Sequence, residues 1–300
     1  MLVLAVMLAA GPESCAGCHA ERVQSYRETA HHRASMPASA ETIRGSFEQG
    51  RNVLRTAVDA VYFLMERRGD AFYQTGIDRG RTRSERFDFV IGSGRRGQSY
   101  LYGKNGALYQ LPVSFLALTG DWINSPGYPD GKIFFDRAIP RQCLDCHTTA
   151  GSGGQFAAGI GCAKCHGTAE KHPEIRSPAR LDRDRQVAVC AACHSGLAEA
   201  PKADVHGNQV GLLQQSRCYR ASPRMSCSAC HDVHRVERDL VALSARCGTC
   251  HAAAQCKQAS RADNCIDCHM PRQKSQAITF QAAGRELAQT YRTHRIGIYR

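Results

Sequence analysis

A five-residue motif, Cys-x-x-Cys-His, occurs seven times in this chain of 300 residues. Two thiols three positions apart can bond to the two vinyl groups of one porphyrin, and the histidine that follows can ligate its iron, so the motif is typical of c-type haem attachment. We number the copies one to seven in chain order: Cys15-Ala-Gly-Cys18-His19, Cys143-Leu-Asp-Cys146-His147, Cys162-Ala-Lys-Cys165-His166, Cys190-Ala-Ala-Cys193-His194, Cys227-Ser-Ala-Cys230-His231, Cys247-Gly-Thr-Cys250-His251 and Cys265-Ile-Asp-Cys268-His269. The sequence therefore predicts seven covalently attached c-type haems.

Other uses of paired cysteines fit this pattern less well. One copy alone would also suit half of a zinc site or a thioredoxin-like redox pair. Neither chemistry requires a histidine after every second cysteine, and here all seven copies have one. Haem attachment is the interpretation that accounts for the whole set.

The second axial ligands of the irons must come from outside the motifs. Six histidines are available: His31, His32, His172, His206, His234 and His294. His31 and His32 are adjacent and are not expected to ligate the same haem, so five or six histidines serve seven irons. The remaining iron or irons have three alternatives: a methionine (Met36, Met225 or Met270), a ligand from a second chain, or an open position that binds a small oxyanion.

Two cysteines remain outside the motifs, Cys218 and Cys256. In an oxidising compartment a disulfide between them is the simplest expectation. Two free thiols, or a thiolate ligand to an iron, are the alternatives.

The segment between motifs one and two has the pattern of β-strands. Alternation as in Phe87-Asp-Phe89, a Gly69-Asp70 turn and an Asn105-Gly106 turn predict an antiparallel meander within residues 45–140, with strands between 58 and 111. Residues 12–44 are expected to form a small helical unit with one haem, and 141–300 a six-haem region of short helices that closes with a helix over 282–292. The predicted fold class is thus a mainly α multihaem cytochrome with little regular structure, plus an antiparallel β-meander insertion.

The start of the chain and its charge bear on location. Residues 1–11 are apolar and end in small residues, as in a secretory signal peptide. Export to the periplasm or cell exterior agrees with covalent haem, which is attached outside the cytoplasm. The formal charge of +12 comes mostly from arginine, which suits the planar carboxylates of haem propionates. We therefore expect no nucleic-acid partner.

Four segments resemble the cytochrome c-554-like family of periplasmic multihaem cytochromes. They are Tyr26 to Met36, Gly161 to Gly167 with His172, Cys227 to His234, and Cys265 to Pro271. The likeness covers about half of the chain, and residues 45–140 look like an insertion. It implies electron transfer through stacked, mostly bis-His haems, with His31 or His32, His172, His234 and His294 as distal ligands; His206 has no clear counterpart.

The sequence thus favours an electron carrier over an enzyme. Its expected partners are redox proteins, including a membrane-anchored quinol-oxidising or reductase protein, and a homo-oligomer is compatible with the ligand deficit. One alternative is a multihaem oxidoreductase of a nitrogen or sulfur oxyanion at an open iron, with polar groups from Arg95, Arg96, Tyr100, Tyr102 and Tyr109. The other is a subunit of an extracellular cytochrome filament.

Overall fold

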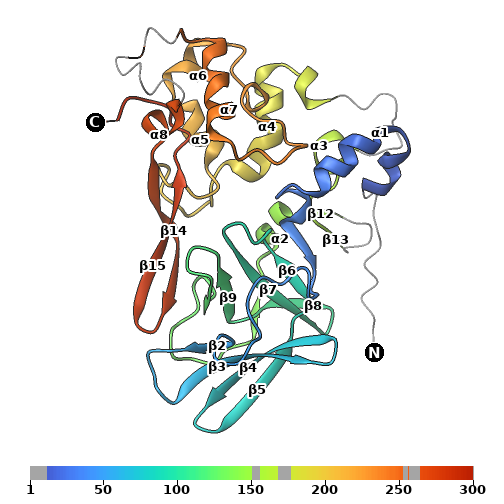
Figure 1. The fold of residues 1–300 in the computed structure, drawn as a ribbon, viewed down its shortest axis with the longest axis vertical. Helices are drawn as coiled ribbons and strands as arrows, with labels where there is room; N and C mark the ends of the chain where they lie inside the picture. The colour runs from blue at the N-terminus through green and yellow to red at the C-terminus, as the bar shows by residue number, and fades with distance from the viewer. Residues whose placement is uncertain (1–11, 151–155, 168–176, 253–255, 257–263, 300) are drawn as a thin grey trace. The chain divides into compact units, whose positions relative to one another are not determined.

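A computed structural model of the chain describes residues 12–150, 156–167, 177–252, 256 and 264–299. The chain divides into two compact units (Figure 1). The first comprises Met1–Lys164 and Thr279–Leu287, and the second comprises Cys165–Ile278 and Ala288–Arg300. The expected signal peptide, residues 1–11, and the expected ligand His172 lie outside the described residues.

The first unit is built mostly from antiparallel strands. Two larger sheets have the orders β2-β3-β4-β5 and β1-β6-β7-β8-β11, with β9 pairing both β7 and β10. The elements are α1 (Pro12–Arg27), η1 (His32–Ala34), β1 (Ser35–Pro37), β2 (Val53–Arg55), β3 (Val61–Arg68), β4 (Ala71–Asp78), β5 (Arg81–Arg86), β6 (Phe89–Ile91), β7 (Gly97–Lys104), β8 (Ala107–Gln110), β9 (Val113–Leu116), β10 (Asp121–Asn124), β11 (Arg137–Ala138), α2 (Arg141–His147), β12 (Thr148–Ala150) and β13 (Phe156–Ala158).

Antiparallel strands are present between residues 58 and 111, but the alternating stretch around Phe87 is the break between β5 and β6 rather than one strand. Side chains of β3 alternate between buried and half-buried positions along Val61–Glu66, as a strand with one face on a core requires. Asn105 and Gly106 have φ values of 53° and 76°, which is the two-residue hairpin turn that an Asn-Gly pair favours.

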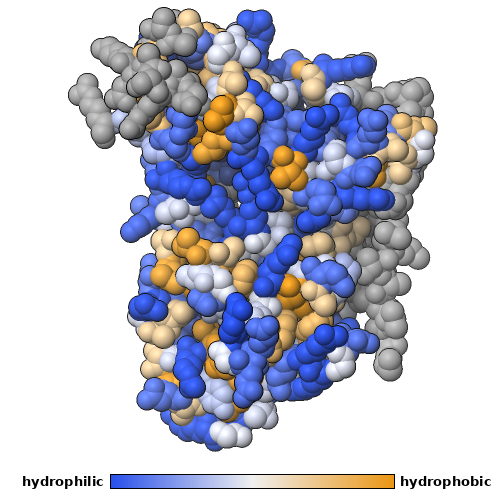
Figure 2. All heavy atoms as spheres, viewed as in Figure 1, coloured by the Kyte–Doolittle hydropathy of each residue, from blue (hydrophilic) through white to orange (hydrophobic). Residues whose placement is uncertain are grey.

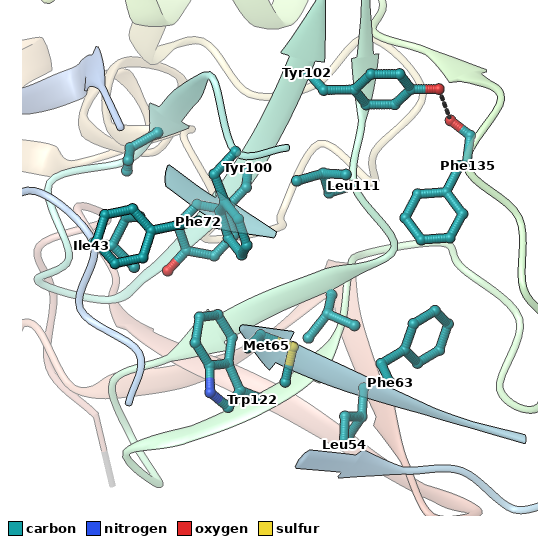
Figure 3. Close-up of a cluster of buried hydrophobic side chains, with 13 residues drawn as sticks. Ile43, Leu54, Phe63, Met65, Phe72, Tyr100, Tyr102, Leu111, Trp122 and Phe135 are labelled. Atoms are coloured by element: carbon teal, nitrogen blue, oxygen red, sulfur yellow. Dashed lines mark hydrogen bonds between the residues drawn. The ribbon is translucent and has the colours of Figure 1, made fainter. Parts of the chain in front are cut away.

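Both larger sheets contribute to one hydrophobic core (Figure 3). Phe63 and Met65 of β3 and Tyr100 of β7 are completely buried in it, beside Trp122 of β10. Gly45 passes directly over Trp122, where a Cβ atom would lie 2.1 Å from the indole ring, so this position requires glycine. The β-part of the chain therefore has a core made of its own side chains.

The second unit consists of short helices and one hairpin. Its small core comprises Val187, Val210, Leu213 and Tyr219, and the motif residues Cys190 and Cys227 pack against it. The elements are α3 (Ala163–His166, at the boundary between the units), η4 (Pro178–Arg180), α4 (Arg183–His194), α5 (Gln209–Gln214), α6 (Arg217–Ala221), η5 (Cys227–Ala229), α7 (Leu240–Ala245), η6 (Arg246–Thr249), α8 (Cys265–His269), β14 (Arg272–Ala282) and β15 (Arg285–Arg292), the last two shared with the first unit.

The mainly α fold class predicted from the sequence is wrong. Of the residues that the structure describes, only 28% are helical, whereas 30% form strands in four antiparallel sheets. Most helices around the motifs are one or two turns long, and the region expected to be helical also contains the sheets β12-β13 and β14-β15. The closing helix expected over 282–292 is strand β15, because Ala283 and Gly284 both have positive φ and turn the chain back as a hairpin.

Candidate functional site

Each Cys-x-x-Cys-His motif in the described residues lies on a single helical turn or at the end of a helix. Motif four ends α4, motif two ends α2, motif seven forms α8, and motif one lies on α1, where His19 breaks the helical geometry. Motif five begins with η5 and motif six lies in η6. Residues three apart on such a turn share one face, so the two thiols of a motif face the same side.

The motif thiols are accessible. Each of the fourteen motif cysteines is exposed or half-buried rather than fully buried. Such thiols remain open to covalent attachment. Burial nevertheless raises the pKa of Cys247 to about 11, with a further contribution from the Cys265 thiol beside it.

Two histidine pairs join a motif histidine to one outside the motifs. The ring centres of His166 and His234 are 6.0 Å apart, and those of His231 and His294 are 6.3 Å apart; both ring pairs are tilted by 34°. A metal–imidazole bond is about 2 Å long, and ring bonds of about 1.33 Å put the ring centre about 1.1 Å from each nitrogen, so two imidazoles on opposite sides of one metal have centres about 6 Å apart. Both pairs have the spacing that a bis-His iron requires.

Two other motif histidines, His194 and His269, are held through Nδ1. An oxygen of Gln209 lies 3.0 Å from Nδ1 of His194, and the Gly297 carbonyl oxygen lies 2.8 Å from Nδ1 of His269. An N–H held in this way fixes the ring orientation and leaves Nε2 for a metal, as the outer partners of metal-bound histidines do.

Two more Nδ1 atoms face carboxylates. Glu237 Oε2 lies 3.3 Å from Nδ1 of His231, and Asp232 Oδ1 lies 3.3 Å from Nδ1 of His234. Burial alone would raise the pKa of Glu237, but its hydrogen bonds, above all with Arg246, keep that pKa below its usual value.

Burial favours the neutral form of His294. Burial lowers the pKa of its imidazole to about 4, and the nearby rings of His231 and His194 contribute to this shift. An imidazole with this pKa carries no proton to lose at neutral pH before it binds a metal.

His31 and His32 lie in the turn between α1 and β1. The His31 carbonyl accepts a hydrogen bond from Ile160 N at 3.0 Å, and Ser35 Oγ donates to the carbonyl of His147 in motif two at 2.8 Å. Gly159 approaches the His32 carbonyl so closely that a Cβ atom would lie 2.1 Å from it. The turn is therefore fixed beside motif two and the strand that leads into motif three.

His206 occupies a loop that is held by a buried carboxylate. Asp204 is 5% exposed and accepts hydrogen bonds from His206 N (2.7 Å), Ser275 Oγ (3.1 Å), Ala277 N (3.1 Å) and Gln276 N. The His206 ring meets Tyr291 edge to face at 5.1 Å. These bonds keep the pKa of Asp204 below its usual value, although burial alone would raise it.

The other predicted site residues have less direct support. Cys218 and Cys256 are free thiols and do not form the disulfide that is the simplest expectation. Met225 packs, as Cys190 and Cys227 do, against the small core of the second unit, whereas Met36 pairs with Val90 in the β-part. Tyr100 and Tyr102 are buried in the core of the first unit, so they do not supply surface groups for an open iron.

Bare metal ions are a poorer fit than haem. Within the described ranges, no three or more His, Cys, Asp or Glu side chains are grouped so that they could hold a metal ion. A haem iron takes four ligands from the porphyrin and needs only two from the chain. The motif turns and the two histidine pairs offer ligands of the type and number that a haem iron needs, so their chemistry fits c-type haem.

The described part of the chain has no helix with the length and apolar character needed to span a bilayer. On the face drawn in Figure 2, hydrophobic side chains lie in small groups separated by hydrophilic ones. Comparison of the chain with family models, with curated proteins and with solved structures finds no match.

Proposed function

We propose that this chain is an exported seven-haem c-type cytochrome that carries electrons between redox proteins, similar in its haem segments to the cytochrome c-554-like family. The observation that carries the proposal is the pairing of His166 with His234 and of His231 with His294 at 6.0 and 6.3 Å. Each pair combines one motif histidine with one from elsewhere. Two such pairs at the spacing of a shared metal are not required by any packing of the polypeptide alone.

The chain would hold each haem through two thioethers and one motif histidine. Haem supplies reversible one-electron chemistry at its iron, with a potential that depends on the axial ligands, nearby hydrogen bonds and burial. His234 and His294 would complete two of the irons, and a second histidine as ligand favours a lower potential than a methionine does. Gln209, Asp232, Glu237 and the Gly297 carbonyl orient the imidazoles.

The thiols also suggest which haem sites are neighbours. The Cys190 and Cys227 thiols, from motifs four and five, hydrogen-bond to each other, which lowers the pKa of Cys227 and raises that of Cys190. Cys247 and Cys265, from motifs six and seven, also hydrogen-bond to each other. Sites in such contact suit electron transfer along a chain of haems, and partners would be soluble or membrane-anchored redox proteins.

Low-temperature EPR of the oxidised protein, followed by reduction and addition of CO, tests this proposal. We expect low-spin ferric signals and no shift of the Soret band with CO, as irons with two axial ligands give. A high-spin signal with CO binding would reveal an open iron and support an oxidoreductase of a small oxyanion instead. The absence of any haem spectrum in protein made by a host that attaches c-type haem would refute both.

A further inference from the structure

The histidine of motif five has a charged partner. Glu237 Oε2 lies 3.3 Å from Nδ1 of His231, and the Glu237 side chain is only 16% exposed. Glu237 is in the loop between η5 and α7, six residues after the histidine, where the sequence shows no motif. A carboxylate that accepts an imidazole N–H increases the basicity of the nitrogen on the opposite side of the ring.

Arg246 fixes this carboxylate in place. Its Nη2 forms an ion pair with Glu237 Oε1, and its Nη1 donates a hydrogen bond to the carbonyl of Cys230, which belongs to motif five. Arg246 directly precedes Cys247, the first residue of motif six. The pair Glu237 and Arg246 therefore connects the histidine of motif five to the start of motif six.

Two other motif histidines have neutral partners. Nδ1 of His194 faces the side-chain amide oxygen of Gln209, and Nδ1 of His269 faces the backbone carbonyl of Gly297. A neutral oxygen acceptor polarises the imidazole N–H bond less than a carboxylate does, because hydrogen bonds to charged groups are stronger. Motif five is thus distinguished from motifs four and seven.

Motif five also lies among other attachment sites. Its Cys227 thiol forms a hydrogen bond with the Cys190 thiol of motif four. Its Cys230 thiol is close enough to Cys250 of motif six for the two to interact electrostatically. His234, three residues after His231, pairs with His166 of motif three. Motif five thereby contacts residues of motifs four and six, and the segment just after it reaches motif three, so the potential of its haem would affect electron flow among these sites.

We propose that Glu237 is a positioning residue that lowers the reduction potential of the haem held by motif five, at a junction of the haem sites. This proposal rests on the proposed function. The step concerned is the one-electron reduction of a ferric iron by a neighbouring ferrous haem. A more basic His231 stabilises the ferric state, so the electron leaves this site more readily.

The test is a spectroelectrochemical titration of the holoprotein and of the variant Glu237→Gln, which keeps an oxygen acceptor but removes the charge. We expect one of seven potentials to rise by about 59 mV, equivalent to a tenfold change in the equilibrium constant of a one-electron couple, at the lower end of outer-partner effects. The matched control is Glu199→Gln, an exposed residue of the same unit, in which no single potential should move alone.

A second variant keeps the test decisive if Glu237→Gln folds poorly. Arg246→Gln removes the cation that balances Glu237, so the same potential should fall. His294→Ala identifies the motif-five signal by EPR, because it removes the expected second ligand of that iron. Unchanged potentials in both variants, with seven haems still attached by mass, would overturn the proposal. Absence of covalent haem in the parent protein would instead refute the proposed function.

Discussion

The loop that carries His206 should depend on one buried carboxylate. Asp204 receives four hydrogen bonds, two on each oxygen: Oδ1 from His206 N and Ser275 Oγ, and Oδ2 from Gln276 N and Ala277 N. In Asp204→Asn one of these oxygens becomes an NH₂ group, which cannot accept. At least one backbone N–H of this partly buried network then faces a donor and loses its partner.

The cost of this change can be worked out from the bonds involved. An orphaned buried donor costs about 1–3 kcal/mol, and the bonds that remain lose their charge assistance, so we expect Asp204→Asn to reduce the free energy of unfolding by about 2–4 kcal/mol. Denaturant unfolding of the holoprotein, followed by far-UV circular dichroism, measures this difference. The control Asp184→Asn changes a carboxylate whose side chain is 75% exposed and should alter stability by less than about 0.5 kcal/mol.

A loss below about 0.5 kcal/mol in Asp204→Asn would refute the reasoning, because it would mean that the four bonds do not form in solution. A large loss in both variants would show that the charge change, rather than the buried network, is responsible.

Four further predictions follow from individual contacts. Because its folded pKa is lowered, Asp204 adds stability above its unfolded pKa of about 3.9 that is lost as the pH falls through the folded value; the difference between the parent and Asp204→Asn should therefore shrink in unfolding curves recorded in acid, and a constant difference would contradict this. His234→Ala and His294→Ala should each turn one low-spin haem high-spin by EPR, whereas the exposed neighbour Arg295→Ala should not; an unchanged spectrum removes that histidine from the ligands. Cys265→Ser should lose the haem of motif seven, as measured by the mass of the intact protein, and should destabilise the C-terminal part. An unchanged haem mass would show that motif seven is not an attachment site. Gly45→Ala should cost about 1–3 kcal/mol through overpacking against Trp122; full stability in thermal unfolding would show that the indole moves freely.

Short sequence patterns predicted those turns and strands whose conformation depends on a few neighbouring residues. The Asn105-Gly106 turn predicted a hairpin that is present, because such a turn depends on two adjacent residues. The alternation around Phe87 did not predict a continuous strand correctly, since Phe87 lies between β5 (Arg81–Arg86) and β6 (Phe89–Ile91). The helix expected over 282–292 was wrong, since the Ala283-Gly284 pair is a weaker turn signal than Asn-Gly and the chain pairs with β14 instead.

The partners of the motif histidines were harder to predict. Asp232 is only two residues before His234, so a local contact between their side chains could have been predicted from the sequence. Glu237 and Arg246 meet over nine residues, and Gly297 reaches His269 over twenty-eight. Contacts of this kind depend on how the chain folds back, which spacing along the sequence does not encode.

Intact-protein mass spectrometry under denaturing conditions tests the central claim most directly. The protein should be produced in a host that exports it and attaches c-type haem. We predict that the polypeptide carries the mass of seven haems that survive denaturation, because each is bound through two thioethers. A polypeptide without covalently bound haem would contradict the account, and a smaller number of haems would identify motifs that do not function as attachment sites.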